Sequence, residues 1–100
     1  MAYTIKYSVG VTDDLRAVPA YRRRELLDRI DTELIYTPQQ VTRNKKMLPG
    51  LIPPWEHMPP VWELRIGEIR VFYDIDDEAQ IVSVRAIRRK PAHRNTEEIL

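Results

Sequence analysis

Apolar and polar side chains alternate in four segments of the chain, and this period-two pattern predicts four β-strands. The segments are residues 3–9, 61–66, 69–75 and 80–89. The first strand stands alone near the start of the chain. The other three follow one another closely, so we expect them to form an antiparallel meander.

In the segment between the first predicted strand and the other three, apolar residues recur at helical spacing instead of at every second position. Leu27, Ile30 and Leu34 recur on one helical face, which predicts a helix over residues 19–36 with Pro19 in its first turn. Thr12 is placed to cap a short helical turn before it. Residues 95–100 are expected to form a last helical turn, with Asn95 or Thr96 as its cap.

Residues 38–60 show neither periodicity, and five of the eight prolines fall between residues 49 and 60. This composition predicts a restrained loop, which is either functional or packed as a lid. The order of elements predicts one α+β domain spanning residues 1–100. Its N-terminal strand and one or two helices precede the three-stranded meander, and the helices pack on one face of a small antiparallel sheet.

The first hairpin of the meander has a definite predicted register. Gly67 and Glu68 form a two-residue turn that places Ile66 opposite Ile69 and Arg65 opposite Arg70. One face of the hairpin is then apolar, and the other carries charged residues and an aromatic. The apolar residues are Trp62, Leu64, Ile66, Ile69, Val71, Tyr73 and Ile75, and the opposite face carries Glu63, Arg65, Arg70 and Phe72.

A second two-residue turn at Asp77–Glu78 would place Arg85 beside Arg70, with Arg89 at the same parity as Arg85. Arg65, Arg70, Arg85 and Arg89 would then project from the face away from the helices. Opposed like charges destabilise a sheet, whereas guanidinium groups match phosphate, so this face is a candidate polyanion site. Alternatively, Glu63, Asp74 or an acidic partner chain neutralises the arginines.

The composition of the chain limits which ligands and cofactors it can bind. The net charge is only +1, but basic residues cluster at residues 43–46 and 85–94. The chain has no cysteine and only two histidines, so we expect no disulfide, no metal site and no cofactor. No segment has the apolar length of a signal peptide or membrane span, so we expect a cytoplasmic protein without membrane contact.

The block WELRIGEIRVFYDIDDEAQIVSVRAI, residues 62–87, carries the pattern LR-x-G-x-x-RV-x-Y-x-ID and precedes a basic run. With the RNKKML segment before it, this block resembles the RelE/ParE superfamily of bacterial type II toxin–antitoxin toxins. For a RelE-type member the resemblance implies a metal-independent endoribonuclease that enters the ribosome and cuts mRNA. For a ParE-type member it implies a DNA gyrase inhibitor.

The resemblance also suggests roles for particular residues. Arg65 and Arg70 match basic strand positions, Arg70 as the arginine that holds the scissile phosphate, and Arg89 matches the arginine that stabilises the transition state. Relatives often carry a tail tyrosine, and Asn95 stands near that position here. His93 is then the candidate for proton transfer, since imidazole groups titrate near neutral pH, and Glu63, on the same sheet face as Arg65, is the alternative base. The remaining basic residues would bind RNA backbone; they are Lys45, Lys46, Arg85, Arg88, Lys90 and Arg94.

The leading prediction is a RelE-type mRNA endonuclease that inhibits translation; the alternatives are a ParE-like gyrase inhibitor and a catalytically degenerate antitoxin-binding protein. Two features favour the gyrase inhibitor: relatives have a basic residue at the position of Glu63, and this chain lacks the tail tyrosine. The implied partners are an acidic, partly disordered antitoxin, with a heterotetramer as one assembly, and the ribosome with its mRNA.

Overall fold

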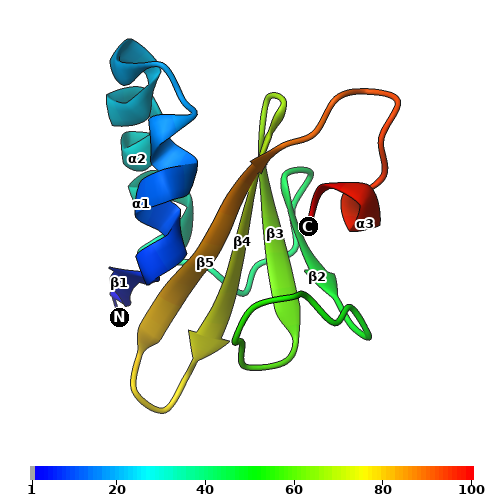
Figure 1. Ribbon diagram of the computed structural model, residues 1–100. Coiled ribbons are helices and arrows are strands. Elements are labelled where there is room, and N and C mark those ends of the chain that lie inside the picture. The colour runs from blue at the N-terminus through cyan, green and yellow to red at the C-terminus, as the bar shows by residue number, and fades with distance from the viewer. Residues whose placement is uncertain (1) are drawn as a thin grey trace.

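A computed structural model describes residues 2–100 and shows a five-stranded sheet flanked by helices (Figure 1). The elements in chain order are β1 (Thr4–Tyr7), α1 (Val9–Arg16), α2 (Ala20–Leu34), β2 (Lys45–Leu48), β3 (Val61–Ile66), β4 (Ile69–Asp76), β5 (Ile81–Arg89) and α3 (Thr96–Ile99). The predicted α+β class is confirmed.

The sheet order is β1-β5-β4-β3-β2, and β1 pairs with β5 in parallel. The predicted antiparallel meander of β3, β4 and β5 is confirmed. The sheet as a whole is mixed rather than antiparallel, because β1 joins it in parallel. A fifth strand, β2, lies within the segment that we predicted to be a loop, and it pairs with β3. Figure 1 shows α1 and α2 on one side of the sheet and the short α3 on the other.

The helices begin and end close to the predicted places, with one exception. Helix α2 begins one residue later than predicted, with Pro19 as its N-cap rather than in its first turn, and α3 is capped by Asn95, as predicted. Helix α1 begins at Val9 with Ser8 as its N-cap, so Thr12 lies inside the helix and caps nothing. Val9 consequently leaves the strand pattern and is 94% exposed.

The main core lies between α2 and the sheet. Leu26, Ile30 and Leu34 of α2 pack with the apolar face of the β3–β4 hairpin, including Leu64 and Val71. Burial of each such side chain contributes roughly 1.5–3 kcal/mol. All seven residues that we predicted on this face belong to the cluster, so the register of the first hairpin is confirmed.

A second apolar cluster covers part of the opposite face of the sheet. Val61, Phe72 and Ala86 form its buried centre, and the proline-rich segment and the C-terminal tail pack over them. The Trp55 ring lies 5.6 Å from the Phe72 ring, centroid to centroid. The proline-rich segment thus completes a second core, and this half of the face is closed.

The second hairpin differs from its prediction in two ways. Its turn has four residues, 77–80, because Asp76 pairs with Ile81. A β-bulge at Arg85 then shifts the register by one more residue, and the two changes together place Arg88 rather than Arg85 opposite Arg70. The longer turn preserves the parity of side chains, whereas the bulge reverses it for every later residue of β5.

In the described part of the chain, none of the helices combines the length and the apolar character that a membrane crossing requires.

Candidate functional site

A small polar hollow of about 180 Å³ lies at the end of the sheet that carries the β3–β4 turn, on the face away from α1 and α2. Four segments that are distant in the chain contribute to it: β2 and the loop before it, the β3–β4 hairpin, the residue after β5, and α3. The lining residues are Arg43, Asn44, Lys46, Glu63, Arg65, Arg70, Lys90 and Thr96.

Arg65 and Arg70 face each other across the hairpin at the centre of this lining. Arg65 is exposed, and its backbone N–H donates to the Asn44 carbonyl at 2.7 Å, which fixes the β2 loop beside it. Arg70 is only 7% exposed, and its Nη1 donates to the Gly67 carbonyl at 2.7 Å and the Ile69 carbonyl at 3.1 Å. The turn of the hairpin therefore holds the Arg70 guanidinium in place.

Burial lowers the pKa of Arg70, and the Arg65 charge acts in the same direction, while the Glu63 carboxylate opposes both. A guanidinium titrates so far above neutral pH that Arg70 stays cationic. Within residues 2–100 neither Arg65 nor Arg70 forms an ion pair with a carboxylate. Both guanidinium groups thus keep donors for an anion.

Glu63 is the one carboxylate among the described residues that line the hollow, and it is 4% exposed. Its Oε2 accepts a hydrogen bond from Thr96 Oγ1 at 3.2 Å, and its Oε1 lies 3.7 Å from Lys46 Nζ. The carboxylate is therefore held between α3 and β2. A carboxylate has about four lone pairs, so Glu63 can accept further hydrogen bonds.

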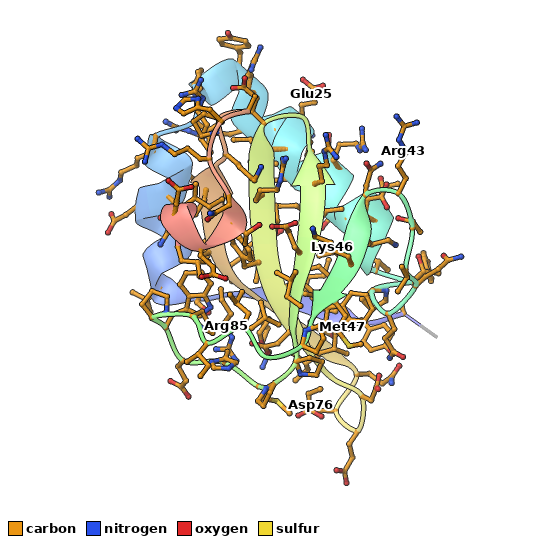
Figure 2. All side chains as sticks on the ribbon, turned by 90° about the vertical axis from the view of Figure 1, so that its right-hand side faces the viewer. Glu25, Arg43, Lys46, Met47, Asp76 and Arg85 are labelled. Atoms are coloured by element: carbon orange, nitrogen blue, oxygen red, sulfur yellow. The ribbon has the colours of Figure 1, made fainter. Side chains whose placement is uncertain are left out.

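Five of the predicted site residues meet in the hollow, namely Lys46, Glu63, Arg65, Arg70 and Lys90. Three lining residues were not predicted: Arg43, Asn44 and Thr96. The basic RNKK cluster was a signal for the first two, whereas nothing local in the sequence indicated that Thr96 returns to the sheet. Figure 2 shows Arg43 and Lys46 on the β2 side of the molecule, with Arg85 well away from them.

Arg85 and Arg88 lie outside the hollow and are neutralised elsewhere. Arg85 Nε donates to Asp74 Oδ2 at 2.8 Å, so Asp74 neutralises this arginine, which was the alternative to a phosphate-binding role. Arg88 Nη1 lies 2.8 Å from Asp14 Oδ1, and its guanidinium stands 5.5 Å from the centre of the Trp55 ring. The prediction that Arg85 lies beside Arg70 was wrong because the longer turn and the bulge together shift the register.

Arg89 projects from the opposite face of the sheet. It pairs with Ile69, whose side chain packs in the main core, and its Nε donates to Glu68 Oε2 at 3.0 Å. The same bulge is the cause, since it moves Arg89 from the predicted face to the face of α1 and α2. Arg89 does not join Arg65 and Arg70.

Lys45 is 2% exposed and serves the fold rather than the surface. Its Nζ donates to the Glu33 carbonyl at 3.0 Å and the Thr37 carbonyl at 2.8 Å, and it lies 3.6 Å from the Glu33 carboxylate. A cation at the C-terminal end of α2 satisfies carbonyl groups that the helix leaves free. The predicted contact of Lys45 with RNA backbone is inconsistent with this burial.

The two predicted residues of the tail also lie apart from the hollow. His93 is exposed and is absent from the lining, so its position gives no support to a proton-transfer role. Arg94 Nη1 donates to Glu98 Oε2 at 3.3 Å along α3. Of the two predicted proton-transfer residues, Glu63 lines the hollow and His93 does not.

The hollow suits a phosphate group. Five cationic side chains surround a single carboxylate, and arginine forks match phosphate oxygens. Within residues 2–100 there is no group of three His, Cys, Asp or Glu side chains placed to hold a metal ion.

Comparison with known proteins assigns the class of the molecule. The model of the family "ParE toxin of type II toxin-antitoxin system, parDE" matches residues 5–91. The chain belongs to this family, and it is a toxin of the RelE/ParE superfamily. Among curated proteins, no sequence matches significantly.

Solved structures agree in fold. The RelBE2 toxin–antitoxin complex from Mycobacterium tuberculosis matches with a TM-score of 0.66 and 21% identity, over 90% of this chain and 100% of that one. The archaeal RelE–RelB complex from Pyrococcus horikoshii matches with a TM-score of 0.62 and 21% identity, and the match covers 95% of this chain and 100% of that one. The isolated E. coli RelE toxin matches with a TM-score of 0.64 and 18% identity, and the match covers 97% of this chain and 92% of that one.

Proposed function

We propose that this toxin is a ribosome-dependent mRNA endonuclease that inhibits translation. The observation that carries the proposal is the opposed pair Arg65 and Arg70, which forms no ion pair within residues 2–100 and lines a hollow of about 180 Å³ beside Glu63. The RelE toxins among the structural neighbours have the same fold.

The proposed reaction is attack of the RNA 2′-hydroxyl on the adjacent phosphorus. The new P–O bond forms as the bond to the 5′ oxygen breaks, which leaves a cyclic phosphate and a free 5′ hydroxyl. Arg65 and Arg70 would stabilise the added negative charge on the phosphorane, which is usually the largest contribution to such catalysis. Glu63 would accept the 2′ proton, and Lys46 or Lys90 would donate one to the leaving oxygen.

The proposed partners follow from the same surface and from the neighbours. Two neighbouring structures are complexes of RelE-type toxins with their antitoxins. We propose that an acidic, partly disordered antitoxin neutralises this chain, with a toxin–antitoxin heterotetramer as one assembly, and that the toxin acts in the cytoplasm. A short adjacent reading frame for an acidic protein would support this pairing.

Induced expression followed by primer extension on cellular mRNA tests the activity. The proposal predicts cuts within translated regions, and their loss in Glu63→Gln. Glu25→Gln is the matched control, since Glu25 is an exposed carboxylate on α2. Growth arrest with intact mRNA would contradict the proposal.

A gyrase inhibitor is the second candidate, because the family model that matches is that of the ParE toxin. The position of His93 outside the hollow agrees with it. In that case the toxin would block supercoiling by purified gyrase and induce an SOS response, while mRNA would stay intact.

A further inference from the structure

Glu63 and the two arginines share one small hollow, yet they do not pair. The Glu63 carboxylate is close enough to Arg70 to oppose the lowering of the guanidinium pKa by burial, but neither Arg65 nor Arg70 forms an ion pair within the described residues. A buried carboxylate is normally hydrogen-bonded or paired, and the guanidinium groups of the same hollow are available as donors. Something must therefore hold Glu63 toward the other side of the hollow.

Thr96 and Lys46 are the two groups that contact the carboxylate. Thr96 Oγ1 donates to Glu63 Oε2 at 3.2 Å, and Lys46 Nζ lies 3.7 Å from Oε1. The Lys46 side chain is 58% exposed, so its ion pair is screened by water and costs side-chain entropy. The hydroxyl of Thr96 is the better-defined anchor.

The backbone of α3 holds Thr96 in place. The Asn95 side chain accepts from the backbone N–H of Glu98, and the backbone N–H of Asn95 donates to the Glu98 carboxylate, which completes a capping box. Ile99 and Leu100 then pack on the second apolar cluster. The tail is thus docked at both ends, and Thr96 lies against β3.

We propose that Thr96 is a positioning residue that holds the Glu63 carboxylate away from Arg65 and Arg70, which keeps both guanidinium groups free for a phosphate. Without the hydroxyl, Glu63 turns toward the arginines and becomes an internal competitor for the anion. The phosphate site itself belongs to the proposed function, and the role of Thr96 deepens it.

A crystal structure of Thr96→Val tests the positioning without reference to activity. Valine has nearly the shape of threonine and lacks the hydroxyl. The Glu63 carboxylate is expected within ion-pair distance of Arg65 or Arg70 in this variant, and at its present position in Thr96→Ser. A carboxylate that stays in place in Thr96→Val would overturn the inference.

Binding of a fluorescent 2′-O-methyl RNA tetranucleotide at low ionic strength tests the consequence. We expect Thr96→Val to weaken binding about tenfold, because a charge-assisted hydrogen bond is lost and a competitor is gained. Thr96→Ser should stay within about twofold of the wild type. In a Glu63→Gln background, Thr96→Val should lose its effect, because the competing charge is gone.

The two backgrounds separate positioning from a merely structural role. If Thr96→Val weakens binding equally in the wild type and in the Glu63→Gln background, Thr96 acts through the fold, and the inference is overturned. A wild-type chain that does not cut mRNA would contradict the proposed function alone, because the crystallographic result does not depend on cleavage.

Discussion

Arg65 on β3 and Arg70 on β4 lie directly opposite each other, and within residues 2–100 neither forms an ion pair with a carboxylate. Arg70 is buried and held by the carbonyls of the hairpin turn, whereas Arg65 reaches solvent. Two opposed cations attract an anion, but their mutual repulsion lowers the stability of the sheet. The free protein therefore tolerates a local repulsion that a bound phosphate would relieve.

Arg65→Thr should stabilise the protein. Removal of one of two opposed charges relieves repulsion, and the expected gain in the free energy of unfolding is about 0.5 kcal/mol at low ionic strength. The gain should shrink as salt screens the pair. Urea unfolding at two salt concentrations measures it, with Lys6→Thr as a control at an exposed position on β1. A loss of stability at both salt concentrations would contradict the expected repulsion.

Arg89→Ala should leave the activity of the toxin within about twofold of the wild type. Arg89 lies on the other face of the sheet, and its ion pair with Glu68 is exposed, which is worth at most about 1 kcal/mol. The assay is ribosome-dependent cleavage, with thermal unfolding as the check on folding. A hundredfold loss in a folded variant would mean that Arg89 acts in catalysis after all.

Lys45→Met should destabilise the protein by about 2–3 kcal/mol. The buried ammonium group donates to the Glu33 carbonyl in the last turn of α2 and to the Thr37 carbonyl beyond the helix, and charge-assisted bonds of this kind are worth about 1.5–3 kcal/mol. Lys46→Met is the matched control on the next residue of the same strand, and it should change stability by less than about 0.5 kcal/mol. Equal losses in the two variants, measured by urea unfolding, would refute the structural role of Lys45.

Tyr73→Phe should alter the alkaline limb of the stability curve. Burial, and then the charge of Glu33, raise the pKa of Tyr73 above its ordinary value, and its hydroxyl donates to the Pro38 carbonyl at 2.7 Å. The unfolded chain ionises near pH 10 while the folded chain keeps the proton, so the contribution of Tyr73 is present below about pH 10 and is lost above it. The variant should lose about 1 kcal/mol at neutral pH and fall less steeply above pH 10. Parallel curves of unfolding free energy against pH would contradict this.

The first hairpin could be predicted residue by residue because its two signals agree. Apolar residues occupy every second position on both strands, and Gly67 supplies the left-handed backbone, with φ +58°, that the turn requires. Helix α2 was equally clear from its spacing. The placement of Arg65 opposite Arg70, on which the candidate site depends, follows from this agreement.

The rest of the site depended on features with weak local signals. The bulge at Arg85 adds one residue to β5 and moves every later side chain of this strand to the other face of the sheet. Its one sequence signal is the adjacent apolar pair Ala86 and Ile87, which are buried on opposite faces. Strand β2 is short and basic, and Lys45 reaches the core side through a buried ammonium group, so no alternation marks it. The return of α3 to the sheet is set by tertiary packing of Ile99 and Leu100.

Primer extension on an mRNA translated by purified ribosomes, with wild-type toxin and Arg70→Ala compared at equal concentration, tests the central claim most directly. We expect cuts in the presence of ribosomes with the wild-type chain. Cleavage should be about 100-fold slower with Arg70→Ala, since loss of one stabilising donor typically costs at least that factor. Arg24→Ala, which removes an exposed arginine of α2, should cleave like the wild type. Intact mRNA with the wild-type chain, or equal cleavage by Arg70→Ala, would contradict the proposed role of the arginine pair.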